Sequence, residues 1–383
     1  MSVNALSPCP HRPPCPGCPR YGDRSAPASA ERELGELAAA AGLAPPTLVR
    51  GADLAFRQRA RLAVRGRSAS PKLGLFQEGT HQIVDIPSCP IHHPRINEVA
   101  AALKRGVRAS GVAPYADAPH RGDLRYVQIA IERASGQAQL VLVGNAERPD
   151  PLDGLAQQLA RELGSALHSL WWNGNPERTN RILGPHWLHV SGPPALVEHV
   201  NGIAVHFPPG AFAQSHAALA EQLAARVAAW VPAGARVAEL YAGCGSLGLG
   251  VLAQAASVAF NELEPQALHG LALGLAERPP EEQARARFVP GRAGDAASLV
   301  AESDVVIVDP PRRGLDAALL AALCATPPAR LVYVSCGLPA FLREARELLA
   351  ATDLRLRALE IYALFPYTEH VETLALFTRD AVQ

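Results

Sequence analysis

A thiol and a carboxyl group each follow a short apolar stretch in the C-terminal half of the chain. Cys336 comes directly after residues 331–335, L-V-Y-V-S, and Asp309 comes directly after residues 305–308, V-V-I-V. Such stretches are typical of short buried β-strands. In an open α/β sheet, ligands bind just outside the carboxyl ends of the strands. A cysteine at that edge can act as a nucleophile, although an isolated cysteine is more often a small core residue.

A glycine-rich turn lies upstream of these two strand ends. Residues 236–240 are expected to form a strand, Y-A-G-C-G-S-L-G-L-G follows, and a helix is expected after it. Gly243 and Gly245 permit a tight turn and the close approach of a ligand. The next predicted strand, 258–261, runs into Glu262, and an acidic residue at that place commonly binds ribose hydroxyls. This order predicts a doubly wound nucleotide-binding domain without the Gly-Lys-Ser or Gly-Lys-Thr of a P-loop.

Clustered cysteines near the N-terminus indicate a metal site. Three of them fall in the proline-rich segment 8–20 with the spacing C-x5-C-x2-C, and a fourth follows a strand-like run and is flanked by prolines. A loop too rich in proline for regular secondary structure can be ordered by thiolates that share a metal. Four thiolates suit either zinc or a [4Fe–4S] cluster, and the spacing leaves both open. The candidate ligands are Cys9, Cys15, Cys18 and Cys89, with His11, His92 and His93 as alternatives for zinc.

Composition sets wider limits. The chain has 383 residues, with 36 basic and 36 acidic side chains, so any surface that attracts nucleic acid must be local. Seven cysteines in a chain of this length do not suggest a disulfide framework. The N-terminus has no apolar core like that of a signal peptide, and no uninterrupted apolar span could cross a bilayer. We therefore expect a cytoplasmic protein in a reducing compartment.

The most basic stretch begins near residue 50. In F-R-Q-R-A-R-L-A-V, residues 56–64, a strand would place Arg57, Arg59 and Arg61 on one face. A solvated strand face is the ordinary explanation, but adjacent like charges also suit RNA or DNA phosphates. Helices are expected at 96–110 and 150–167, with strands between 124 and 143. The tryptophans at 171, 172 and 187 are expected to pack in a core, with stacking on bases as the alternative.

These patterns predict three regions. Residues 1–48 would hold the cysteine loop and a short helix at 30–41, with the fourth ligand supplied from Cys89. Residues 49–205 would form an α+β domain, and residues 206–383 an α/β domain. In the last region, helices are expected at 217–230, 316–324 and 340–350. His370 and Glu372 fall in a turn before the final strand, 373–378.

The motifs of the C-terminal region resemble those of a known family. The order Y-x-G-C-G, E-L-E, D-P-P-R-R-G, S-C and F-P-x-T-x-H-V-E is similar to that of the bacterial RNA uracil-5-methyltransferases, S-adenosylmethionine-dependent enzymes that make 5-methyluridine. The four N-terminal cysteines resemble the [4Fe–4S] site of the members that act on 23S rRNA. The resemblance implies a C-terminal class I, Rossmann-like methyltransferase domain preceded by an α+β RNA-binding region and a cluster loop.

The resemblance also implies residue roles. Cys336 would add to uracil C6, C5 would take the methyl group, and Glu372 would remove the C5 proton. The implied cofactor contacts are Gln214, Tyr241, Ser246, Glu262 and Asp309, while Arg292 and Asp295 remain alternatives for one further contact. The implied substrate is rRNA, with tRNA as an alternative, and the enzyme would act as a monomer. A further hypothesis is a non-catalytic RNA-binding or assembly factor. It is suggested by the loop around Cys336, which reads S-C-G-L-P where the family commonly has S-C-N-P.

Overall fold

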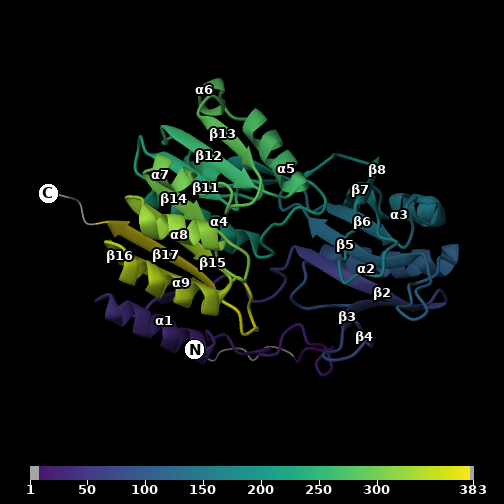
Figure 1. Ribbon diagram of the computed structural model, residues 1–383. Coiled ribbons are helices and arrows are strands. Elements are labelled where there is room, and N and C mark those ends of the chain that lie inside the picture. The colour runs from purple at the N-terminus through teal and green to yellow at the C-terminus, as the bar shows by residue number, and fades with distance from the viewer. Residues whose placement is uncertain (1–7, 380–383) are drawn as a thin grey trace. The chain divides into compact units, whose positions relative to one another are not determined.

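The computed structural model describes residues 8–379, which form two compact units (Figure 1). Among the described residues, one unit contains 8–23 and 52–196, and the other contains 24–51 and 197–379. In the described part of the chain, no helix combines the length and the apolar character that crossing a membrane requires.

The C-terminal unit is built on an eight-stranded sheet. Its strand order is β1-β16-β17-β15-β14-β11-β12-β13. Strands β11 to β15 run parallel, whereas β17 lies antiparallel to both β15 and β16. The order reverses at β11, which pairs with β12 on one side and β14 on the other, so a ligand crevice is expected at that edge. The strands are β1 (Thr47–Val49), β11 (Arg236–Leu240), β12 (Ser257–Glu262), β13 (Ala286–Pro290), β14 (Val305–Val308), β15 (Arg330–Ser335), β16 (Leu354–Tyr362) and β17 (Glu372–Arg379).

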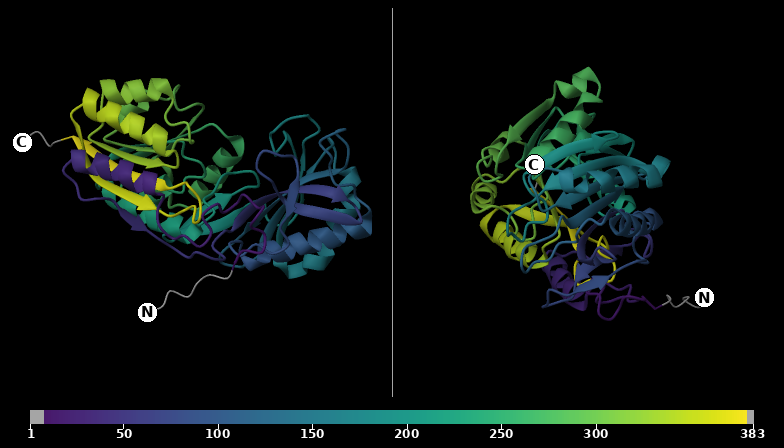
Figure 2. Two further views of the ribbon diagram at one scale, coloured as in Figure 1. Left: turned by 90° about the horizontal axis from the view of Figure 1, so that it is seen from below. Right: turned by 90° about the vertical axis from the view of Figure 1, so that its right-hand side faces the viewer.

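Helices cover both faces of this sheet (Figure 2). Strands β14 and β15 carry almost only apolar side chains because they are buried on both faces, as parallel strands usually are. One core joins α1, α8 and α9 to these strands and includes Leu34, Leu319 and Phe341. The helices of the unit are α1 (Ala28–Ala40), α4 (Ala217–Trp230), α5 (Pro265–Ala276), α6 (Pro280–Gln283), α7 (Leu299–Glu302), α8 (Ala317–Ala325) and α9 (Leu338–Ala351). A two-stranded sheet, β9 (Leu196–Val200) with β10 (Ile203–Phe207), precedes α4.

The C-terminal unit departs from the sequence-based expectation in two places. Residues 24–51 contribute α1 to its core and β1 to its sheet edge, where β1 pairs with β16, although residues 1–48 are expected to form one region with the cysteine loop. The helix expected after the glycine turn is only a 3₁₀ turn, η3 (Gly248–Val251). Glycine has poor helix propensity, and Gly245, Gly248 and Gly250 all fall in this short segment. The remaining predicted strands and helices of the unit form within a few residues of their expected positions.

The N-terminal unit is an α+β structure with a seven-stranded sheet. Its order is β4-β3-β2-β5-β6-β7-β8, and every pair is antiparallel except β6 with β7. Helices α2 and α3 pack with these strands in one core. The second helix ends at Leu163, before the predicted 167, because Gly164 follows it with a positive φ. The elements are β2 (Arg59–Arg67), β3 (Ser70–Phe76), β4 (Ile83–Asp85), α2 (Pro94–Ser110), β5 (Leu124–Ile131), β6 (Ala138–Gly144), η1 (Asp150–Leu152), α3 (Asp153–Leu163), η2 (Gly164–Ala166), β7 (Leu167–Gly174) and β8 (His186–Ser191).

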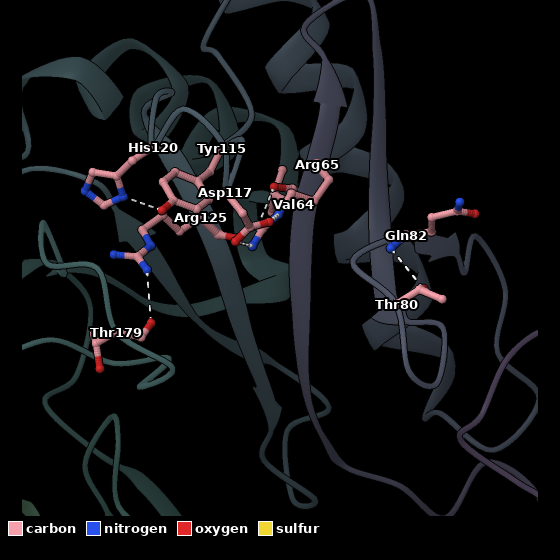
Figure 3. Close-up of polar contacts among 9 residues, drawn as sticks. All are labelled: Val64, Arg65, Thr80, Gln82, Tyr115, Asp117, His120, Arg125 and Thr179. Atoms are coloured by element: carbon pink, nitrogen blue, oxygen red, sulfur yellow. Dashed lines mark hydrogen bonds and ion pairs between the residues drawn. The ribbon is translucent and has the colours of Figure 1, made fainter.

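Part of the basic stretch is buried rather than available to a partner. The Arg65 guanidinium forms an ion pair with Asp117, with Nε 2.8 Å from Oδ2, and donates to the carbonyl oxygen of Arg125 at 2.9 Å. Arg65 and Arg125 both lie over the ring of Tyr115, at 4.9 and 4.6 Å from its centroid (Figure 3). Arg125 also donates to backbone carbonyls of the 175–179 loop, including that of Thr179. These two arginines therefore stabilise loops of the N-terminal unit.

Candidate functional site

Three groups named from the sequence come together at the carboxyl edge of the eight-stranded sheet. Asp309 follows β14, Cys336 follows the neighbouring β15, and Glu372 begins β17. Ser335 of β15 pairs with Thr373 of β17, so Cys336 emerges beside Glu372. Because β14 and β15 are parallel, their carboxyl ends deliver Asp309 and Cys336 to the same edge.

The electrostatics of these groups show that they interact. Glu372 is fully buried, and neither of its carboxylate oxygens has a hydrogen-bond partner in the described part of the chain. Burial, together with the charge of Asp309, raises the pKa of Glu372 well above its ordinary value, and burial raises the pKa of Asp309 to about 7. Burial and the two carboxylates raise the pKa of Cys336 to about 11, and the Arg312 guanidinium opposes this rise.

Arg312 belongs to the segment D-P-P-R-R-G, residues 309–314, which we call the proline loop. Its Nη1 donates to Nε2 of His370 at 3.2 Å, and its positive charge lowers the pKa of both Cys336 and Glu372. The D-P-P-R-R-G motif contains this arginine, but the motif alone does not indicate which groups its charge faces. It is the cation that opposes the two carboxylates around the Cys336 thiol.

The turn after Cys336 packs tightly against the proline loop. A Cβ atom on Gly337 would lie 2.3 Å from the carbonyl oxygen of Arg312 and 2.9 Å from its carbonyl carbon. Both atoms are backbone, so a side-chain rotation cannot relieve the contact. The glycine that replaces the asparagine of S-C-N-P is therefore required by the close approach of the two loops in this chain.

The glycine turn is braced by two acidic side chains. Glu262 accepts hydrogen bonds from the backbone nitrogens of Gly243, Leu263 and Glu264 at 2.8, 2.6 and 2.7 Å. Glu239 is 2% exposed and accepts from the backbone nitrogen of Gly248 at 3.0 Å, and burial raises the pKa of Glu239 to about 8. These bonds hold the glycine turn in place at the carboxyl ends of β11 and β12.

Tyr241 starts the glycine turn with φ of +61° and anchors α8. Its hydroxyl accepts from the backbone nitrogen of Asp316 at 2.9 Å and donates to the Asp316 carboxylate at 3.3 Å. Burial raises the pKa of Tyr241 to about 12. The φ value lies in the left-handed region, which an aromatic residue seldom adopts, so this position is strained in a way that is common at ligand sites.

Two other expected cofactor contacts, Gln214 and Ser246, are half-buried in the same unit. Gln214 lies in the segment before α4, two residues after Phe212, which is 68% exposed, and Ser246 lies in the glycine turn. Arg292 and Asp295 are both exposed in one turn, in which the nitrogen of Asp295 donates to the carbonyl oxygen of Arg292 at 3.1 Å.

The four candidate cysteine ligands line one cavity of about 180 Å³ in the N-terminal unit. Among residues 8–379, no three His, Cys, Asp or Glu side chains lie close enough together to hold a metal ion, so a four-cysteine metal site is not established. Burial and the mutual repulsion of the thiolates raise the pKa of Cys18 to about 12. The cysteines that line this cavity are Cys9, Cys15, Cys18 and Cys89.

The alternative zinc ligands have different surroundings. His11 and His92 line the cavity, and burial lowers the pKa of His92 to about 4. His93 instead caps α2, with its Nδ1 accepting from the backbone nitrogen of Arg95 at 3.2 Å. Two arginines expected on an RNA-facing strand, Arg57 and Arg61, also line the cavity.

Comparisons with known proteins agree with the geometry of the C-terminal unit. The family model of the tRNA (uracil-5-)-methyltransferases matches residues 298–380, which contain the proline loop, Cys336 and Glu372. An RNA methyltransferase of Protochlamydia amoebophila is 37% identical over 340 residues, covering 87% of this chain and 88% of that protein. A 23S rRNA (uracil(747)-C(5))-methyltransferase, RlmC, of Vibrio cholerae is 27% identical over 339 residues and 88% of each chain.

A solved structure has the same fold. It is that of the Pyrococcus abyssi tRNA (uracil-54, C5)-methyltransferase in complex with S-adenosyl-L-homocysteine, with a TM-score of 0.75 and 22% identity, covering 91% of this chain and 82% of that one. This confirms the expected α/β class with a Rossmann-like methyltransferase domain. The chain belongs to the family of S-adenosylmethionine-dependent RNA (uracil-5-)-methyltransferases.

Proposed function

We propose that this enzyme methylates C5 of a uridine in 23S rRNA, with Cys336 as the nucleophile and Glu372 as the base. The observation that carries the proposal is the convergence of Cys336, Glu372 and Asp309 at one sheet edge, with Arg312 beside them. An unpartnered buried carboxylate next to a thiol is costly unless a ligand uses it.

The chemistry follows from the weak nucleophilicity of uracil C5. The Cys336 thiol loses its proton to solvent, and the resulting thiolate forms a bond to C6. The electron pair of the C5–C6 double bond moves toward C5 and the adjacent C4 carbonyl, which makes C5 nucleophilic. Bound S-adenosylmethionine supplies the methyl group that C5 takes. Glu372 then accepts the C5 proton, the C5–C6 double bond re-forms, and the Cys336 thiolate leaves. Its raised pKa makes the Glu372 carboxylate a stronger base once it is ionised.

The cofactor site we propose surrounds the glycine turn. Glu262 would hold the ribose hydroxyls, and its hydrogen bonds to the turn keep its carboxylate in position for them. Tyr241, Ser246 and Gln214 would complete the cofactor contacts, and Asp309 would lie between the cofactor and the uracil. Calorimetric titration with S-adenosyl-L-homocysteine tests this site, and Glu262→Gln is expected to weaken binding.

We propose further that the four cysteines hold a [4Fe–4S] cluster in the N-terminal unit. Support comes from the single cavity that all four thiols line and from the elevated pKa of its buried thiols, which a bound metal would reverse by ionising them. Zinc is the alternative. Iron and acid-labile sulfide in anaerobically purified protein, with visible absorption lost in Cys18→Ala, test the cluster, and a colourless zinc-containing protein would reject it.

The RNA class is proposed from the relatives. The Vibrio cholerae relative is named for 23S rRNA, and it aligns over 88% of each chain. The structural neighbour is named for tRNA, which keeps tRNA as the alternative. We expect a cytoplasmic, monomeric enzyme that contacts RNA through Arg59 and Arg61 at the start of β2 and through Arg57 just before it. Mapping 5-methyluridine in rRNA and tRNA from a deletion strain decides between the two RNAs.

The covalent mechanism has a direct test. RNA with 5-fluorouridine at the target should form a stable adduct with the wild-type enzyme and S-adenosylmethionine, because the fluorine at C5 cannot be removed as a proton. Cys336→Ala should form none. Absence of an adduct with wild-type protein that binds both ligands would favour a non-catalytic RNA-binding role.

A further inference from the structure

A buried carboxylate lies behind the proline loop, away from the reacting groups. Glu344 is on α9, and its side chain is only 1% exposed. Its Oε2 accepts hydrogen bonds from the Tyr333 hydroxyl at 2.5 Å and from the backbone nitrogen of Leu315 at 3.1 Å. Its Oε1 pairs with the Arg343 guanidinium at 2.6 Å. The proposed chemistry does not use this carboxylate, so its burial calls for another explanation.

Glu344 joins the two strand ends of the site. Tyr333 is in β15, three residues before Cys336, and Leu315 directly follows the proline loop. One carboxylate oxygen therefore bonds both the strand that carries the nucleophile and the loop that begins with Asp309. Tyr333 is fully buried and packs edge-to-face on Phe341 of α9, the helix that carries Glu344. This packing fixes the direction of the Tyr333 hydroxyl.

The loop rests directly on this carboxylate. Gly314 has φ of +92°, and a Cβ atom there would lie 2.0 Å from Oε1 of Glu344. The nitrogen of Gly314 also closes a turn onto the carbonyl oxygen of Pro311 at 2.8 Å. On its other side, the loop meets the turn after Cys336, where Gly337 abuts the carbonyl oxygen of Arg312. The loop is thus held between Glu344 and Gly337.

We infer that Glu344 is a positioning residue, whose carboxylate fixes the proline loop so that Arg312 faces Cys336. This rests on the proposed function of Cys336. Without the bonds from Tyr333 and Leu315, the loop can move, and the arginine that opposes Glu372 and Asp309 moves with it. A displacement of about 1 Å at such a place can lower a rate about 100-fold.

The test measures the rate of covalent adduct formation with 5-fluorouridine RNA, at saturating RNA and S-adenosylmethionine. Glu344→Leu should lower this rate about 100-fold, while the RNA concentration for half-maximal rate stays unchanged. Glu344→Gln should recover most of the rate, because its carbonyl oxygen can still accept from Tyr333 and Leu315. Tyr333→Phe should lose about tenfold, as expected for one bond to a charged group. Glu347→Gln, an exposed change on the same helix, is the matched control and should leave the rate unchanged.

The outcomes separate this inference from the proposed function. If the wild-type enzyme forms no adduct, the proposed function fails. If the wild-type enzyme forms it and folded Glu344→Leu matches its rate, only the positioning role is overturned. Should Glu344→Leu not fold, Tyr333→Phe decides: a slower saturating rate supports the role, and a wild-type rate overturns it. A lower melting temperature with an unchanged saturating rate would indicate a purely structural role and likewise overturn the inference.

Discussion

Replacing Gly337 by alanine tests the contact between the two loops of the active site. The new Cβ would lie 2.3, 2.9 and 3.0 Å from the carbonyl oxygen, carbonyl carbon and Cα of Arg312. Gly337 has φ of −116°, which alanine adopts readily, so the penalty is steric rather than torsional. Ordinary contact requires the backbone atoms to separate by about 1 Å, and overpacking of this kind costs about 1–3 kcal/mol.

The functional effect should exceed the loss of stability. Moving the proline loop by about 1 Å shifts Arg312 relative to Cys336, and such a shift can lower the rate about 100-fold. We expect Gly337→Ala to bind S-adenosyl-L-homocysteine normally, to melt at a lower temperature and to form the 5-fluorouridine adduct about 100-fold more slowly.

A matched substitution controls for the added methyl group. Gly35 lies in α1 of the same unit, and a Cβ there meets no atom within 4 Å. Gly35→Ala should therefore be neutral or stabilise the protein by up to about 1 kcal/mol, because alanine favours helix. Wild-type melting temperature and adduct rate in Gly337→Ala would show that the loops are not in steric contact and would refute the reasoning.

Three further predictions follow from the carboxylates and the thiol. Because the pKa of Cys336 is about 11, its thiolate fraction and the adduct rate should rise roughly tenfold per pH unit between pH 7 and 9. Quenched time courses of adduct formation measure this rate, and a rate independent of pH would contradict the prediction. Burial raises the pKa of Glu239 from 4.5 to about 8, so its contribution to stability is complete below pH 4.5 and is lost as pH rises through about 8. Melting temperature should therefore fall for the wild type between pH 6 and 9, and fall less for Glu239→Gln; parallel curves would exclude this role. Glu372→Gln should accumulate a covalent adduct with ordinary uridine RNA and S-adenosylmethionine, because removal of the C5 proton is slowed. Gel electrophoresis measures the amount of adduct. Turnover at the wild-type rate would argue against Glu372 as the base.

The sequence by itself determined which groups lie at the carboxyl ends of the strands. Apolar runs of four to six residues ended by polar residues and helix breakers are local signals, and they located Asp309, Glu262 and Cys336 correctly. The family resemblance assigned Glu372 to the same site. Local patterns also distinguished the α/β unit from the α+β unit. They failed in the glycine turn, where an expected helix is a 3₁₀ turn.

Only the tertiary structure decided how those groups are held and charged. Arg65 belongs to the basic stretch in the sequence, but its surroundings in space, Asp117 and the Tyr115 ring, make it a buried structural residue. Nothing in the sequence marked Glu344, whose partner Leu315 lies 29 positions away. The demand for glycine at 337 arises from the backbone of Arg312. The high pKa of Cys336 arises from burial and from the carboxylates of Glu372 and Asp309, which belong to distant parts of the sequence. Burial, close packing and charge interactions depend on distances in space. A sequence pattern predicts these distances only where neighbours in the sequence are also neighbours in the fold.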